Sequence, residues 1–343
     1  MDTSHGRATI AAFNVRLSEF LAADGMQKIV ACNLRTTQTR SSLMLKNKYI
    51  NGWWLFWPVA VLISVATLVE MSQADMSTGA GVSHMIAYSV RFAVPLIFLV
   101  IAASSMQRLF PGPLSTWWLR NRKYLGLLFA VAMAWQGLFI FTMSVFFRNY
   151  YYEDIYLLRD ELEGSVGYIF LAAMVLTSFR FGRKWLSKQQ WDLLHTSGVY
   201  FLWAYPFSVY WWNLSYYDNP QPVDYFFYWF GFLAFAVRIA AWGKQRLRSA
   251  ASADSTSRTP FVLQLVGGAI IGIGLVAAAT GLRWQDTATT FLTTPEWSAK
   301  LVLWLPFWPF EPFLPLFIIG LGTMLATTTR TSPESVANAV PNP

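Results

Sequence analysis

Apolar runs of about 20 residues recur along the whole sequence, and this recurrence constrains the fold more than any other feature. A membrane-spanning helix needs about 20 predominantly apolar residues. Eight such runs lie at roughly 51–70, 84–107, 124–147, 165–182, 192–213, 223–242, 261–282 and 300–327. Only 13% of the residues are charged, against about 25% in soluble domains, which excludes a soluble globule. The sequence therefore predicts an all-α, polytopic membrane helix bundle with about eight transmembrane helices.

Basic residues alternate between the connections and predict the orientation of the bundle. Lys and Arg number seven in the N-terminal segment and four in each connection after the second, fourth and sixth runs. The connection after the third run has two, against five acidic residues. Because cytoplasmic loops are enriched in Lys and Arg, we expect both termini in the cytoplasm, in a bacterial inner or intracytoplasmic membrane. The net charge of +8 is then an orientation signal, and nucleic acid is not an expected partner.

The segments outside the runs divide the chain. Residues 8–31 mix apolar and charged side chains, which is typical of an amphipathic helix on the inner membrane surface or of a soluble docking helix. Residues 149–164 predict an acidic, amphipathic outer helix. In chain order we expect a cytoplasmic segment, an additional transmembrane helix with its outer loop, a transmembrane core, a cytoplasmic linker, two further transmembrane segments and a disordered tail. These parts are 1–50, 51–83, 84–243, 244–260, 261–327 and 328–343.

Side chains that could carry chemistry are few. The single cysteine, Cys32, excludes an intramolecular disulfide and also a thiolate zinc site or an iron–sulfur cluster held by one chain. The sequence has no glycine-rich nucleotide loop and no GxSxG, HExxH or paired-cysteine motif. The usual equipment of hydrolases and nucleotide-driven pumps is therefore missing. Three histidines remain, His5, His84 and His195.

Three ionisable residues fall inside the apolar runs, where charge is costly and often functional. Arg238 is expected to extend to the inner membrane face, and Arg91 to pair with Glu70 or with a lipid phosphate. Glu311 is a candidate proton or cation site. The prolines on both sides of Glu311 indicate instead a re-entrant or bent segment.

Three stretches between the second and fifth runs share their order with a known family. They read SVRFAVPLIFLVIAASSMQRLFPGP (89–113), NRKYLGLLFAVAMAWQG (121–137) and FRFGRKWLSKQQWDLLHTSGVYFLW (179–203). The first is led by Arg91 and ends in a basic turn, the second opens with basic residues before Leu-Gly-Leu, and the third has a basic loop before Trp191 and His195. This order resembles the ferric-reductase-like transmembrane domain, and most closely the heme-binding membrane subunit of bacterial methionine-sulfoxide reductase systems. The resemblance covers about 150 to 160 residues of the expected core.

The resemblance implies b-type hemes that are held by pairs of histidines and pass electrons across the membrane. One histidine of the pattern follows Leu-Gly-Leu in the third run, where this sequence has Gln136, and another falls on Ser208 in the fifth run. Only His195 remains as a candidate ligand for heme b. Glutamine and serine are poor ligands for low-spin heme iron, and we expect Gln136 and Ser208 to face each other at similar depth. His84 is a candidate single axial ligand for a pigment magnesium.

Loss of both members of one ligand pair favours a role without catalysis. The main hypothesis is an accessory or structural integral-membrane subunit of a larger respiratory or photosynthetic complex, derived from a ferric-reductase-like domain that lost its heme ligands. Its partners would be membrane lipids and other membrane-protein subunits, and no fused flavin or nicotinamide module is expected. Two alternatives stay open: an electron-transfer subunit with one non-standard b-type heme on His195, and a transporter with Glu311 or Arg91 in its path.

Overall fold

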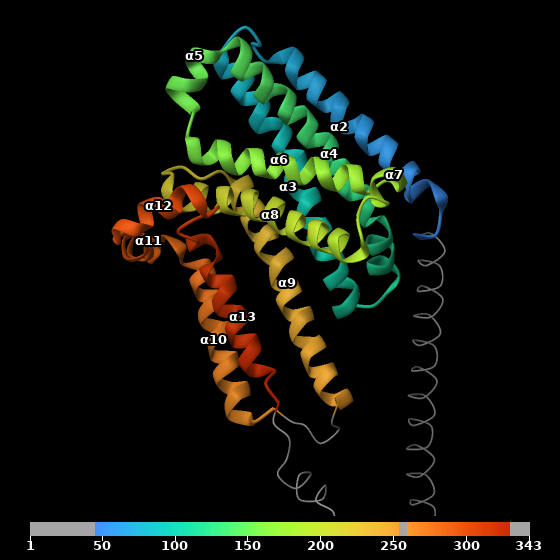
Figure 1. Cartoon of the computed structure of the whole chain (residues 1–343), viewed down its shortest axis with the longest axis vertical. Coiled ribbons are helices and arrows are strands. Elements are labelled where there is room, and N and C mark those ends of the chain that lie inside the picture. The colour runs from blue at the N-terminus through green and yellow to red at the C-terminus, as the bar shows by residue number, and fades with distance from the viewer. Residues whose placement is uncertain (1–44, 254–258, 330–343) are drawn as a thin grey trace, which may run out of the picture. The chain divides into compact units, whose positions relative to one another are not determined.

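The structure, a computed structural model, describes residues 45–253 and 259–329. The chain divides into two units, residues 1–51 and 52–343. Of the first unit, the described part contains a short 3-10 turn, η1 (Lys48–Ile50), which the Asn47 side chain caps. The described residues of the second unit form the helices from α2 to α13 (Figure 1), and the described residues form no strand. The prediction of an all-α chain is confirmed.

Within the described residues, five helices are long and apolar enough to cross a membrane. They are α2 (Trp53–Gln73), α3 (Gly79–Leu109), α4 (Pro113–Phe146), α9 (Pro222–Ala253) and α10 (Phe261–Ala279). Each coincides with one of the apolar runs in the sequence. The chain is accordingly an integral membrane protein.

Two other runs form helices that do not reach the same combination of length and apolarity: α6 (Leu158–Thr177) and α8 (Lys188–Tyr216). In Figure 1 both helices run crosswise to α9. α8 packs on α3 and on α9 where it crosses them. The first turns of α6 contain Asp160 and Glu161, which shortens its apolar part. The count of eight membrane spans therefore stays a prediction.

The last apolar run is broken, as its prolines predict. It contains α12 (Glu296–Trp304), a 3-10 turn η4 (Glu311–Phe313) and α13 (Leu314–Ala326). Proline lacks the backbone N–H that the interior of a helix uses. Pro306, Pro309, Pro312 and Pro315 follow one another at three-residue intervals here, whereas the single prolines of α2, α3 and α8 lie inside continuous helices. Between α12 and η4 the chain takes left-handed conformations at Phe307 (φ 63°) and Phe310 (φ 67°). The segment from residue 305 to 310 therefore forms a compact bend.

The acidic segment after α4 is not one helix. It contains α5 (Arg148–Tyr150) and a π-helical turn η2 (Tyr151–Ile155), and α6 begins after a further break. The Tyr151 hydroxyl donates a hydrogen bond to the Glu161 carboxylate across that break. Partial burial and the neighbouring carboxylate raise the pKa of Tyr151 above its ordinary value. The predicted outer helix over 149–164 is thus corrected to two turns followed by the start of α6.

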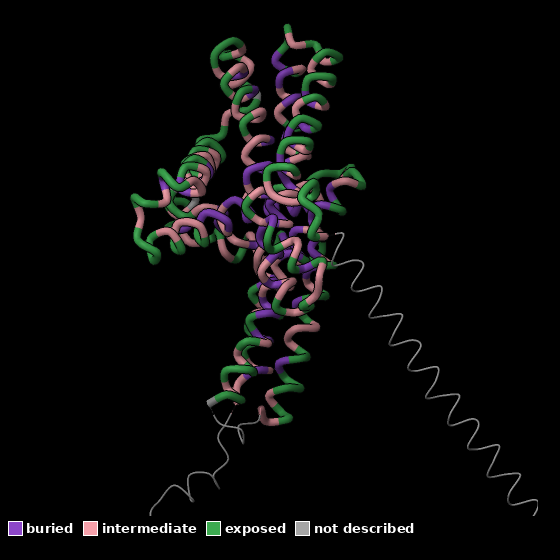
Figure 2. The backbone as a smooth tube through the Cα atoms, turned by 90° about the vertical axis from the view of Figure 1, so that its right-hand side faces the viewer, coloured by how far each residue is buried: buried purple, intermediate pink, exposed green. Residues whose placement is uncertain are grey.

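The core of the second unit lies where α3, α8 and α9 meet, and Figure 2 shows buried residues concentrated there. α3 also packs along α4 and touches α2. The Trp203 ring of α8 stacks on Phe207 of the same helix at 4.9 Å and on Phe235 of α9 at 4.4 Å between ring centroids. The Trp203 indole N–H donates to the carbonyl of Gly231 at 3.0 Å, so this buried aromatic has its polar atom paired.

α10 and α13 form the closest helix pair at the C-terminal side of the unit. A Cβ atom on Gly267 would lie 2.6 Å from the backbone of Gly322 and Ala326, and one on Gly274 would lie 2.6 Å from Ile319. Glycine is therefore needed at both positions for the backbones to approach. The face of α10 with Gly267 and Gly274 packs within this chain.

Three short elements complete the described part of the chain: α7 (Arg180–Arg183), η3 (Gly281–Arg283) and α11 (Gln285–Thr293). α9 continues through Ala253, so the first ten residues of the predicted linker over 244–260 are helical. The predicted amphipathic helix over 8–31 lies outside the described residues, as do His5, Cys32 and nearly all of the predicted tail.

Candidate functional site

His195 lies in the second turn of α8, which begins with a reciprocal capping box between Ser187 and Gln190. Its Nε2 lies 3.0 Å from Oγ1 of Thr177, the last residue of α6. Its ring stacks on Trp191 with 4.1 Å between centroids. The Trp191 indole N–H donates to the backbone carbonyl of the same Thr177 at 3.1 Å. Two aromatic side chains of α8 are therefore fastened to the end of α6.

The hydrogen bonds of Thr177 assign the tautomer of His195. Thr177 Oγ1 donates its single proton to the carbonyl of Ala173 at 2.7 Å, so its lone pair accepts the proton of His195 Nε2. The lone pair of the imidazole is then on Nδ1. A heme iron or a magnesium ion could bind Nε2 only if the bond to Thr177 broke.

Gln136 and Ser208 have separate hydrogen-bond partners. Gln136 Oε1 accepts from the Tyr168 hydroxyl of α6 at 3.1 Å, and the same hydroxyl lies 3.1 Å from the carbonyl of Met133. Ser208 Oγ donates to the carbonyl of Tyr205 within α8 at 2.8 Å. The described residues show no hydrogen bond between Gln136 and Ser208, and their expected approach at similar depth stays a prediction.

His84 pairs with Glu70 at the ends of α3 and α2. The distance from His84 Nε2 to Glu70 Oε1 is 2.7 Å, and the imidazole is half exposed. Glu70 therefore pairs with His84 rather than with Arg91, which corrects one of the two expectations for that arginine. A pigment magnesium at His84 would have to bind Nδ1 or displace the carboxylate.

Arg238 is hydrogen-bonded within a helix junction, whereas the sequence predicts that its side chain extends to the inner membrane face. Its Nε and Nη2 donate to the Tyr200 hydroxyl at 3.0 and 2.7 Å, and Nη1 donates to the carbonyl of Ile101 at 3.0 Å. The guanidinium carbon lies 4.8 Å from the Tyr200 ring centroid. Arg238 thereby joins α9 to α8 and α3 through neutral partners.

Glu311 is almost fully buried in the bend before α13. Its Oε1 accepts from the Tyr216 hydroxyl at 3.0 Å, and its Oε2 accepts from Thr289. On the other side of the bend, Glu163 of α6 accepts from the backbone N–H of Phe307 at 2.8 Å. The two buried carboxylates therefore hold the bend against α6, α8 and α11, and the role of Glu311 as a proton or cation site stays a prediction.

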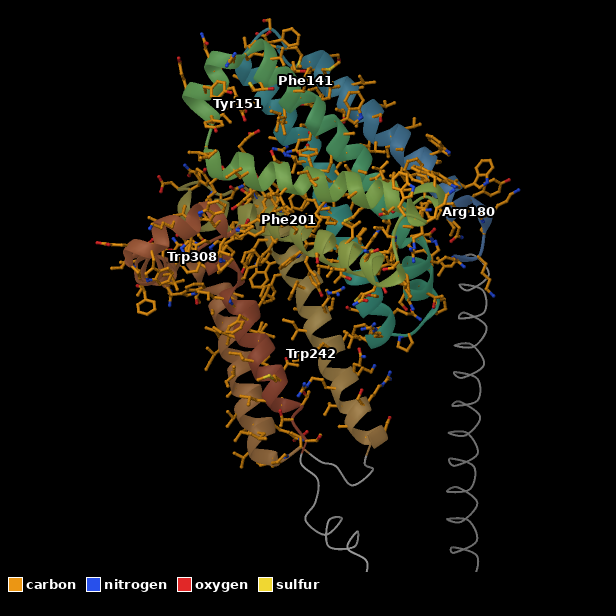
Figure 3. The ribbon with its side chains drawn as sticks, viewed as in Figure 1. Phe141, Tyr151, Arg180, Phe201, Trp242 and Trp308 are labelled. Carbon is orange, nitrogen blue, oxygen red and sulfur yellow. The ribbon has the colours of Figure 1, made fainter. Side chains whose placement is uncertain are left out.

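An aromatic cavity was not foreseen from the sequence. Its volume is about 830 Å³, and its walls come from α6, α8, α9 and the bend with the start of α13. A second cavity of about 460 Å³ shares four wall residues with it and continues between α9 and α13. Phe201 and Trp242, both labelled in Figure 3, line the first and the second cavity respectively. The polar side chains in these walls are Ser197 and Tyr200, apart from the indole nitrogens of Trp203 and Trp242.

The aromatic residues of the cavity are spread over the fourth, fifth, sixth and eighth apolar runs of the sequence. Their spacing alone does not distinguish a cavity wall from a lipid-facing surface, because both are apolar in a membrane protein. The bend that brings Phe307 and Phe313 beside α8 is the missing information.

Metal binding finds no support in the described part of the chain, where no group of three or more His, Cys, Asp or Glu side chains could hold an ion. Comparisons of the chain with protein-family models, with curated proteins and with solved structures give no match.

Proposed function

We propose that this chain is a non-catalytic accessory or structural subunit of a larger membrane complex, built on a ferric-reductase-like bundle that has lost its heme ligands. The observation that carries the proposal is the engagement of His195, whose Nε2 bonds Thr177 and whose ring stacks on Trp191. At this position the family resemblance calls for a heme ligand. The contacts of His195 support a role in fastening α8 to α6.

The outer face of α10 supports contact with another subunit. Gly268 and Gly272 lie four residues apart, and a Cβ atom on either would meet nothing within 4 Å. Large apolar neighbours on this helix are exposed, among them Leu265 at 64% and Val276 at 62%. Small residues at this spacing allow a second transmembrane helix to approach closely. A lipid-facing surface has no such need for glycine.

The proposal includes the finer topology that the sequence suggests. α6 and α8 and the broken last run would bring the number of membrane-associated segments to eight, with both termini in the cytoplasm of a bacterial cell. The complex would be respiratory or photosynthetic, since the resemblance is to electron-transfer membrane proteins.

Mild-detergent purification from the native membrane tests the proposal. We expect other membrane subunits to co-purify with the full chain in fixed ratio. The double substitution G268L/G272L should reduce their recovery several-fold while the midpoint of thermal unfolding of the chain itself stays unchanged, because both positions face open space. Purification of the unaltered chain as a single species with a stoichiometric heme would overturn the proposal.

A further inference from the structure

The two aromatic cavities form one continuous groove along α9 and α13. They share Trp203, Phe235, Phe313 and Phe317 as wall residues. Each of the two volumes, about 830 and about 460 Å³, lies within the range of small-molecule sites, which measure about 300–1,000 Å³. We propose that this groove holds the acyl chains of one anionic glycerophospholipid, whose phosphate is bound by Arg246.

The walls of the groove select apolar chains. The indole N–H of Trp203 is already donated to Gly231, and the Tyr200 hydroxyl already accepts from Arg238. These groups therefore leave the groove few polar contacts with which to recognise a head group inside it. Flexible hydrocarbon fits such a surface because burial of apolar area needs no directional partner.

One stripe of α9 connects the groove to a basic end. Phe235, Ile239 and Trp242 line the groove, and Arg246 follows one turn later on the same face. The Arg246 guanidinium lies 5.1 Å from the Trp242 ring centroid. Its Nε donates to Thr327 Oγ1, just after α13, at 3.0 Å. Arg246 therefore stands where the groove ends, between the two helices that form it.

In the described part of the chain, Arg246 forms no ion pair with an acidic side chain. The ion pairs among the described residues are His84–Glu70 and Arg159–Glu163. Its neighbour Lys244 donates to the carbonyls of Arg108 and Leu109 at 3.1 Å, which are neutral partners. Arginine with free Nη groups is suited to a phosphate, which accepts two hydrogen bonds from one guanidinium.

The position of Arg246 also fits a lipid of the cytoplasmic leaflet. Lys244, Arg246 and Arg248 belong to the connection that the distribution of charge predicts to be cytoplasmic. Anionic head groups attract such basic segments at the membrane surface. A lipid with its phosphate at Arg246 would extend its chains past Trp242 toward Phe235 in the direction of the membrane interior.

Lipid exchange on the purified full chain tests this inference. The chain is delipidated in mild detergent and titrated with phosphatidylglycerol, with phosphatidylcholine of the same acyl chains, and with free glycerol phosphate. Bound lipid is counted by native mass spectrometry. We expect one phosphatidylglycerol to be retained at least about tenfold more tightly than phosphatidylcholine. Both lipids carry the phosphodiester, but the choline ammonium of phosphatidylcholine cancels the net negative charge that Arg246 and its basic neighbours attract. We expect no retention of glycerol phosphate, because the acyl chains are needed as well.

Two pairs of variants test the head-group contact and the binding of the acyl chains in the groove independently. R246Q should remove the preference for phosphatidylglycerol, whereas R248Q, with the same loss of charge on the other side of α9, should keep it. G320F should displace either lipid, because Gly320 lines the groove with open space beside it, whereas G268F on the outer face of α10 should not.

Equal retention of the two phospholipids would overturn the assignment of an anionic lipid, and equal behaviour of R246Q and R248Q would overturn the assignment of the phosphate to Arg246. An unchanged lipid count in folded G320F would overturn the groove as the site of the chains. An isoprenoid or pigment recovered in place of the phospholipid would overturn its chemical class. None of these outcomes depends on whether the chain belongs to a larger complex.

Discussion

Thr177 determines the chemistry that remains open to His195. Because its hydroxyl proton goes to Ala173, it can only accept from the imidazole, and Nε2 is thereby turned toward α6. Gln136 is similarly fixed by Tyr168. At the residue scale, His195 and Gln136 act as links between neighbouring helices, whereas Ser208 is hydrogen-bonded within its own helix.

The substitution T177V tests this link with little change of shape. We expect the midpoint of thermal unfolding in detergent to fall by an amount equivalent to about 1 kcal/mol, because His195 Nε2 loses its acceptor while the isosteric side chain keeps the packing. T142V is the matched control, since Thr142 is bonded only to a carbonyl of its own helix α4. Equal effects of the two substitutions would contradict the link.

At the scale of elements, the bend between α12 and α13 is the feature that organises the aromatic cavity. Hydrogen bonds to other helices hold this bend in place. The N–H of Phe307 donates to Glu163 of α6, and Glu311 accepts from hydroxyl groups of α8 and α11. Arg159 in turn pairs with Glu163 at 3.1 Å. Buried carboxylates with several partners are costly to remove.

The substitution E163A should loosen this bend. We expect the amide of Phe307 to exchange its hydrogen at least about tenfold faster, because a buried N–H left without a partner costs about 1–3 kcal/mol. Hydrogen–deuterium exchange with peptide resolution over residues 300–315 measures the effect. E153A is the control, since Glu153 is exposed in η2. An unchanged exchange rate in E163A would show that the carboxylate does not hold the bend.

The packing of α10 on α13 gives a second prediction at this scale. G267L should lower the thermal midpoint strongly, because even a Cβ atom there would lie 2.6 Å from the backbone of α13 and overpacking costs about 1–3 kcal/mol or more. G268L, one residue further along the same helix, should leave the midpoint unchanged. Similar losses in both variants would mean that α10 is packed on a different face.

At the scale of the whole molecule, much of the fold is predictable from the sequence. Long apolar runs identify the five spanning helices, because a bilayer imposes length and apolarity on a single segment. Proline identifies the break in the last run. The acidic stretch of α6 and the crosswise course of α6 and α8 are not predictable in this way, since they depend on contacts between distant helices.

The candidate site is predictable only in its residue types. The sequence singles out His195, Gln136, Glu311 and Arg238, but their partners come from other helices: Thr177, Tyr168, Thr289 and Tyr200 among them. Side-chain spacing along one helix does not reveal which neighbour it will face. The aromatic groove and its basic end, which depend on the bend and on α13, could not be foreseen for the same reason.

A reduced-minus-oxidised absorption spectrum tests the central claim most directly, that this bundle serves as a structural subunit whose histidine is a helix link. It is recorded on the full chain purified gently from its native membrane, with H195A and H84A prepared alongside. We expect no b-type heme band that belongs to this chain, so that any band from co-purified subunits is the same in all three samples. A stoichiometric b-type band that disappears in H195A and persists in H84A would contradict the account and establish His195 as a heme ligand.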